Sequence, residues 1–276
     1  MKATINPLLE QTSFDSAAPS GAAAVVHKFG DAGEYIVRFI GGETSFAHAR
    51  LTVGADPQTK ESPPDGVSID LTKIEYPSKM GGSDGHEDLF ILRPNGYVSF
   101  TASGKAKSYA VVAEPKTDSY PGEQKAESKA ESKAESKAES KARDKRGGFD
   151  SRRLERDDIF TVTLIRPGDY RVVNELGKYE GLITVAYPVI GDRPYRPPSP
   201  HQVDCNDTGF HPSTIKLQPA QGIVFNIRAA ARIKIDLTKP DDGPKDRPPR
   251  RVGISPQATR DAVERWRQAQ QKKRKS

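Results

Sequence analysis

The strongest constraint on the fold is a strand–turn–strand pattern that occurs twice in the 276 residues. Its first copy is residues 29–37, FGDAGEYIV, followed later by Leu51-Thr52-Val53. Its second copy is residues 164–172, LIRPGDYRV, followed later by Ile183-Thr184-Val185. Another match relates LRPNGYV, which starts at Leu92, to LQPAQGIV, which starts at Leu217. Internal similarity of this kind indicates that one structural unit is built twice.

Short runs rich in β-branched and aromatic residues separate the turns. They are bounded by Gly, Pro and Asn, which is typical of antiparallel strands in a sandwich. The sequence therefore predicts an all-β protein made of tandem Greek-key β-sandwiches, with a basic helix at the C-terminus. The runs are residues 34–39, 97–100, 109–112, 160–164, 170–173 and 182–185.

The matched segments alternate between two kinds of unit, at 20–54, 67–113, 158–188 and 203–239. We expect the middle two units to form one sandwich within 66–190. The outer two, in 1–55 and 200–240, would each expose an apolar sheet face if left alone. We therefore expect them to close on each other as a permuted sandwich. We expect residues 241–276 to form a Pro/Arg-rich linker and the basic helix.

A charged stretch at 115–156 interrupts the expected middle sandwich. It contains a tetrapeptide repeat with Lys at 125, 129, 133, 137 and 141 and Glu at 127, 131, 135 and 139. Opposite charges two residues apart lie on opposing sides of a helix, while neighbours four apart carry like charges. The stretch is interpreted as a flexible or semi-rigid insertion, and the alternative is a helix that binds a partner.

Two families resemble these segments. Residues 209–226 look like the opening strands of a cupredoxin, and residues 167–185 resemble its closing hairpin. Residues 27–37 equally resemble the polycystic-kidney-disease-type immunoglobulin-like repeat. Both resemblances imply a Greek-key β-sandwich, and only the cupredoxin resemblance implies copper.

The copper that the cupredoxin resemblance implies lacks its ligands in this chain. Blue copper needs a thiolate, two imidazoles and usually a thioether. The position expected for the cysteine holds Asn174, the following histidine falls at Lys178 or Tyr179, and the methionine position holds Leu182. We therefore predict no copper and no other cofactor.

His201, Cys205 and His211 form a His-x3-Cys-x5-His cluster whose donor types suit zinc. Only three donors are present, so the alternative is a buried structural cysteine flanked by exposed histidines. Residues 81–85 fit the Gly-x-Ser-x-Gly pattern beside His86, but the residues before them do not read as the strand that a nucleophile elbow needs. The acidic residues at 84, 87 and 88 could attract calcium without EF-hand spacing.

The positive charge of the chain is concentrated in its tail. The formal net charge is +6, and residues 243–276 hold eleven Lys/Arg against three Asp/Glu, which leaves 32 basic and 34 acidic residues elsewhere. Ser255 and Pro256 suit the start of a helix, and the helix dipole favours the basic residues that lie at its end. Either Trp266 docks on a sandwich or the tail contacts a partner through Arg250, Arg251, Arg265, Trp266, Arg267, Lys272, Lys273, Arg274 and Lys275.

These observations favour a non-enzymatic structural or protein-interaction component. One alternative is a nucleic-acid-associated assembly component of ribosomal, capsid or chromatin type, held by its tail. Another is a metal-binding protein or enzyme using His201, Cys205 and His211. Since the sequence has neither an apolar run long enough for a membrane helix nor an apolar leader, we expect no membrane partner and a cytoplasmic location, or a nuclear one in a eukaryote.

Overall fold

The computed structural model describes residues 11–41, 44–54, 62–73, 89–102, 109–116, 148–188 and 195–243, with side chains omitted for 41–48. These residues form strands and no helix, which confirms the all-β prediction. None of them forms a helix long and apolar enough to cross a membrane. The strands are β1 (Ser13–Asp15), β2 (Ala23–Phe29), β3 (Gly33–Gly41), β4 (Thr44–Val53), β5 (Gly66–Asp70), β6 (Leu89–Leu92), β7 (Gly96–Thr101), β8 (Ala110–Pro115), β9 (Phe149–Asp150), β10 (Ile159–Thr163), β11 (Gly168–Asn174), β12 (Tyr179–Val185), β13 (His201–Asn206), β14 (Gly209–His211), β15 (Thr214–Leu217), β16 (Gly222–Ile227) and β17 (Ile233–Pro240).

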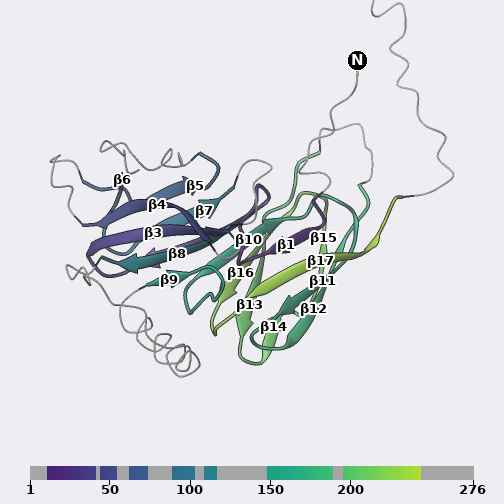
Figure 1. Ribbon diagram of the computed structural model, residues 1–276. Helices are drawn as coiled ribbons and strands as arrows, with labels where there is room; N and C mark the ends of the chain where they lie inside the picture. The colour runs from purple at the N-terminus through teal and green to yellow at the C-terminus, as the bar shows by residue number, and fades with distance from the viewer. Residues whose placement is uncertain are drawn as a thin grey trace, which may run out of the picture. The chain divides into compact units, whose positions relative to one another are not determined.

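The strands make three sheets (Figure 1). Sheet A has the order β1-β17-β11-β12-β15, and sheet C has the order β6-β4-β3-β8-β9. Sheet B has seven strands in the order β14-β13-β16-β10-β2-β7-β5 and belongs to both halves of the molecule. Ring contacts join the layers, with centroids 5.0 Å apart for Phe29 and Tyr35 (sheets B and C) and for Tyr179 and Phe210 (sheets A and B).

The pattern of strand pairing is the same in the two halves, which we call repeat 1 (β1–β8) and repeat 2 (β9–β17). In repeat 1, β3 pairs antiparallel with β4 and β8, β4 pairs parallel with β6, and β7 pairs with β2 and β5. Repeat 2 has the corresponding pairs. β11 pairs antiparallel with β12 and β17, β12 pairs parallel with β15, and β16 pairs with β10 and β13. The internal similarity in the sequence therefore reflects a repeated topology.

The grouping of the four units differs from the expectation. The ladders join 20–54 with 67–113, and 158–188 with 203–239, so neither the middle sandwich within 66–190 nor the closure of 1–55 on 200–240 describes the sheets. The physical reason is that adjacent units already supply both layers of a sandwich, so no apolar face is left for the opposite end of the chain. In the described part of the chain, β1 at one end pairs with β17 at the other.

The first sequence match is confirmed by register, because Gly33 lies opposite Val53 and Gly168 lies opposite Val185. The second match needs a correction of one residue. Asn95 and Ala220 share a left-handed backbone, with φ of 65° and 56°. Asn95 also donates its amide proton to the carbonyl oxygen of Phe29, which ends β2, at 2.8 Å. Ala220 likewise donates to the carbonyl oxygen of Leu164, which follows β10, at 3.0 Å. The counterpart of Gly96 is therefore Gln221 rather than Gly222.

The first strand of each repeat pairs with the other repeat. β1 lies on β17 of repeat 2, and β9 lies on β8 of repeat 1. The same three residues occur at both strands, as Phe14-Asp15-Ser16 and Phe149-Asp150-Ser151, with the serine directly after the strand. This short match was not among the sequence predictions. The phenylalanines and serines are buried in both copies. Because 148–156 belongs to the fold, the charged insertion is shorter than the expected 115–156.

The two repeats are also joined directly, by the antiparallel ladder between β2 and β10. Val25 lies opposite Phe160 in this ladder. Val25 holds the same position in repeat 1 that Phe160 holds in repeat 2. A local pseudo-twofold axis therefore passes between these two residues. Because both are buried and opposite residues point to the same face, sheet B has one continuous buried face and one continuous outer face.

Candidate functional site

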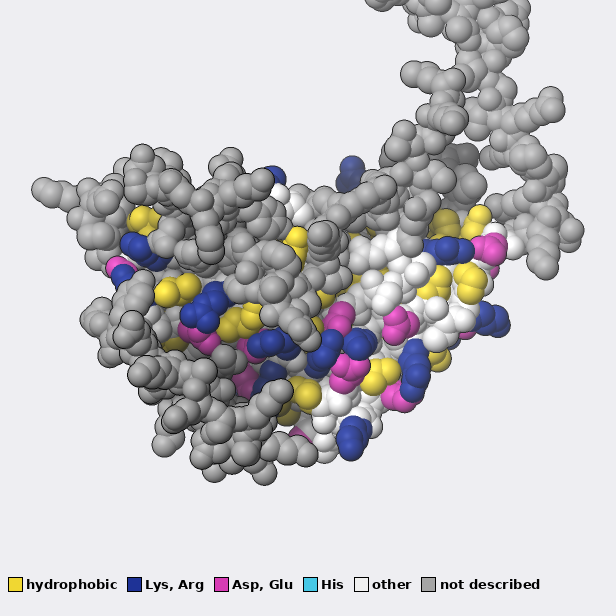
Figure 2. Space-filling view, in the orientation of Figure 1, with side chains coloured by type: hydrophobic (Ala, Val, Ile, Leu, Met, Phe, Trp, Pro, Cys, Tyr) yellow, Lys and Arg dark blue, Asp and Glu magenta, His cyan; other side chains and the backbone are white. Residues whose placement is uncertain are grey.

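The outer faces of sheets A and C are covered by ion pairs. On sheet A, Arg171 contacts Glu180 and lowers the pKa of that carboxyl group by hydrogen bonding. On sheet C, Lys116 binds Glu34 at 2.8 Å and lowers the pKa of Glu34 in the same way. Basic and acidic side chains are interspersed over the region of β11, β12 and β17 in Figure 2. These two faces therefore have the character of ordinary solvated surfaces.

The outer face of sheet B is different, because its centre carries no charge. The central outward positions of β2, β10, β16 and β7 hold small, β-branched or neutral polar side chains, all partly exposed. The surface continues across the β2–β10 ladder and so belongs to both repeats. These central residues, which we call the neutral face, are Ala24, Val26, Ser99, Thr101, Thr161, Thr163 and Val224.

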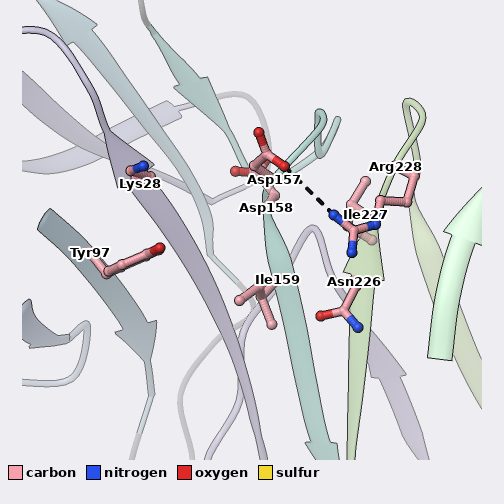
Figure 3. A pocket seen from close by; sticks show the side chains of 8 residues that line it. All are labelled: Lys28, Tyr97, Asp157, Asp158, Ile159, Asn226, Ile227 and Arg228. Atoms are coloured by element: carbon pink, nitrogen blue, oxygen red, sulfur yellow. Dashed lines mark ion pairs between the residues drawn. The ribbon is translucent and has the colours of Figure 1, made fainter. Parts of the chain in front are cut away.

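A pocket of about 290 Å³ opens at one end of the neutral face. Four adjacent strands supply its lining, and Figure 3 shows Tyr97 and Lys28 on one side, Asp157 and Arg228 on the other. Tyr97 of β7 lies directly opposite Lys28 of β2 in the ladder. The complete lining is Lys28, Tyr97, Asp157, Asp158, Ile159, Asn226, Ile227 and Arg228.

The polar groups of the pocket are only loosely paired. The Arg228 guanidinium lies 3.8 Å from Asp157 and 3.4 Å from Asp204, and all three side chains are more than half exposed. Within the described part of the chain, the Lys28 ammonium and the Tyr97 hydroxyl have no partner. Asp157 has a left-handed backbone with φ of 74°, a conformation uncommon for residues other than glycine. Polar side chains that converge on a pocket without pairing tightly with one another can bind a ligand.

A buried pair lies beneath the pocket. The Nδ1 atom of His27 is 2.5 Å from an Asp158 carboxylate oxygen, and the Asp158 side chain is only 2% exposed. The other carboxylate oxygen of Asp158 accepts the backbone amide proton of Glu155 at 2.7 Å. The His27 ring packs against Phe29 and Phe149, at 4.6 and 4.7 Å between centroids. The pair thus connects β2 of repeat 1 to the residue that precedes β10.

The predicted zinc ligands are not brought together. Cys205 is buried on the inner face of β13, whereas His211 is exposed and lies opposite Asp204, whose side chain points outward. His201 is four residues from Cys205 on the same strand, about 13 Å along it. The described residues contain no group of three side chains that could hold a metal ion.

The thiol of Cys205 belongs instead to a buried hydrogen-bonded group. The Tyr179 hydroxyl lies 3.2 Å from the sulfur and donates to the carbonyl oxygen of Asn206 at 2.6 Å. Asn174, at the position expected for a copper-binding cysteine, donates to the same hydroxyl at 2.8 Å. Burial raises the pKa of both Cys205 and Tyr179. The hydrogen-bonded group links β11, β12 and β13 through Asn174, Tyr179 and Cys205.

The other predicted site residues lie outside the described residues. They are the loop at 81–88 and the tail positions Arg250, Arg251, Arg265, Trp266, Arg267, Lys272, Lys273, Arg274 and Lys275, with the predicted C-terminal helix. Sequence analysis did not find the pocket, because its lining comes from four strands and no two of its polar residues form a short motif. The only available signal was the pairing of the repeats, which shows where the two halves differ.

Comparisons with models of protein families, with curated proteins and with solved structures find no match to this chain.

Proposed function

We propose that this chain is a non-enzymatic structural or protein-interaction component, and that it contacts a protein partner through the neutral face. The contrast among the three outer faces carries the proposal. Removing the ion pairs of sheets A and C from water would carry a desolvation penalty, whereas neutral polar and β-branched side chains lose little on burial. Protein interfaces are likewise depleted of charge at their centres.

The size of the face supports the same function. The four strands that carry the neutral face lie about 4.8 Å apart and span roughly 15–20 Å, and five-residue strands are about 17 Å long. The projected area is on the order of 300 Å², enough for the uncharged centre of a standard interface, in which each partner buries roughly 800 Å² of accessible surface.

The finer fold class and the compartment are part of this proposal. The two short sequence parallels support a Greek-key sandwich of cupredoxin or immunoglobulin type for each repeat, without copper or another cofactor. The cytoplasm, or the nucleus of a eukaryote, is the compartment that we propose.

Affinity purification with quantitative mass spectrometry tests the function. Thr161→Glu places a carboxylate at the centre of the neutral face and should abolish recovery of the partner without lowering the midpoint of thermal unfolding. Thr214→Glu is the matched control, because Thr214 is an exposed threonine on the edge strand of sheet A. If both variants recover the same proteins as the wild type, the neutral face is not the interaction surface.

The charge of the tail favours a second candidate, nucleic-acid association. Residues 243–276 carry a net charge of +8, and affinity for phosphates grows with the number of cationic contacts and falls steeply with salt. Truncation after Gly243 should remove binding to RNA and DNA and its salt dependence, while the sheets still fold. Binding that survives the truncation would place the contact elsewhere.

A further inference from the structure

We propose that the pocket at the end of the neutral face binds a saccharide ring. The inference rests on the proposed function, in which this face is the contact surface, and it names the chemistry recognised at one end of it.

The pseudo-twofold axis supplies an internal control for the pocket. Lys28 lies opposite Tyr97 in the β2–β7 ladder, and their counterparts in the β10–β16 ladder are Thr163 and Gly222, which also lie opposite each other. The counterpart of Asp157 is Ala22, since 135 residues separate equivalent positions at this end of each repeat. The corresponding strand pair therefore forms at the other end of the sheet without the aromatic ring or the ammonium group. Strand pairing does not require Lys28, Tyr97 or Asp157, which points to a ligand.

The hydrogen-bonding groups of the pocket suit hydroxyls. Lys28 and Tyr97 offer donors that have no partner among the described residues. Asn226 donates to Gln202 at 3.2 Å, and its side-chain oxygen has no partner in the same part of the chain. The Asp157 carboxylate, held only by the 3.8 Å contact, is a second acceptor. A ligand facing this mixture must both donate and accept, which is the property of a hydroxyl group.

The charges of the pocket disfavour an ionic ligand. Among the lining residues, Lys28 and Arg228 are positive, whereas Asp157 and Asp158 are negative. An anion would be repelled by the carboxylates, and a cation by the ammonium and guanidinium groups. A neutral polar molecule meets neither repulsion and can use all of these groups as hydrogen-bond partners.

The apolar part of the pocket matches the shape of a sugar ring. The Tyr97 side chain is 46% exposed and extends over the sheet toward Ile159 in Figure 3. A large, rigid ring with one polar end can pack on an apolar C–H face while its hydroxyl group bonds to the rim of the ligand. The volume of about 290 Å³ lies at the lower end for small-molecule sites, so the site suits one or two rings.

Titration of the full chain with monosaccharides and disaccharides, followed by amide NMR, tests the inference. Neutral hexoses, N-acetylhexosamines and their disaccharides at tens of millimolar should shift amide signals of residues 28, 97, 157–159 and 226–228. Tyr97→Ala and Asn226→Ala should each weaken binding at least tenfold. Tyr187→Ala, which removes an exposed tyrosine outside the pocket, should leave saccharide binding unchanged.

The outcomes separate this inference from the proposed function. If no saccharide shifts the pocket signals, or if the shifts survive Tyr97→Ala, the saccharide inference is wrong whatever Thr161→Glu does to protein capture. If Tyr97→Ala abolishes protein capture and no saccharide binds, the pocket is part of a protein interface and the inference is also wrong. Saccharide binding together with protein capture that Thr161→Glu leaves intact would remove the proposed function and keep the saccharide site.

Discussion

The exchanged strands place a buried serine of each repeat against the backbone of the other. Ser16 follows β1, and its hydroxyl accepts the amide proton of Ile233 in repeat 2 at 3.0 Å. Ser151 follows β9, and its hydroxyl accepts the amide proton of Val111 in repeat 1 at 2.8 Å. Both serines are fully buried. Replacing each with alanine should therefore disturb the repeat to which that serine does not belong.

The expected loss of stability follows from the orphaned amide. A buried N–H group without an acceptor costs about 1–3 kcal/mol, so Ser16→Ala and Ser151→Ala should each lower the free energy of unfolding by that amount. Ser151 also donates to the carbonyl oxygen of Ala17 at 3.1 Å. Loss of the Ser151 hydroxyl leaves both the Val111 amide and the Ala17 carbonyl without this partner, so Ser151→Ala should be the more costly variant.

Amide hydrogen exchange under native conditions, combined with urea unfolding, measures both effects. Ser16→Ala should accelerate exchange at Ile233 and leave Val111 protected, and Ser151→Ala should do the reverse. A loss of about 1.4 kcal/mol corresponds to tenfold faster exchange, if exchange occurs by the same opening. Acceleration confined to each serine's own repeat, or a loss of stability below about 0.5 kcal/mol in both variants, would refute the strand exchange.

Three further predictions concern the core and the insertion. Burial raises the pKa of Tyr170 to about 12, so the unfolded state ionises first and stability should fall by up to roughly 3 kcal/mol between pH 10 and 12; Tyr170→Phe should reduce this alkaline loss in urea unfolding at pH 8 and 11. Gly168→Ala should destabilise more than Gly33→Ala in thermal unfolding, because an added Cβ would lie 2.4 Å from a backbone oxygen at Gly168 and meets nothing within 4 Å at Gly33. Deleting 125–142 should leave the unfolding midpoint nearly unchanged in calorimetry, because loop length enters the closure entropy only logarithmically.

The internal repeat was predictable from sequence because a local contact enforces it. The Tyr35 hydroxyl donates to the carbonyl oxygen of Asp31 at 3.0 Å, and the Tyr170 hydroxyl donates to that of Arg166 at 2.7 Å. A tyrosine bonded to the backbone a few residues upstream is a recurrent feature of β-sandwiches. Its partners lie within a few residues, so the pattern appears in the sequence as a short motif.

The grouping of the units was not predictable in the same way. Each grouping pairs one kind of unit with the other and buries the same apolar residues, so hydrophobic patterning does not distinguish them. The choice depends on ladders between segments tens of residues apart, such as β3 with β8. The one-residue error arose because the sequence match aligned Gly96 with Gly222. The geometry that the two repeats share is the left-handed backbone of Asn95 and Ala220.

The pocket arises where the pseudo-twofold symmetry fails. On one side of the axis the β2–β10 ladder extends to Ala23 opposite Val162, two apolar residues in regular strand pairing. Symmetry would place a ladder pair at His27 and Asp158 on the other side, but the ladder ends one residue earlier. A side-chain contact of 2.5 Å between these two residues replaces the missing backbone pairing. The strands are thus held together by a buried polar contact rather than by the ladder, at the end of the sheet where Asp158 lines the pocket.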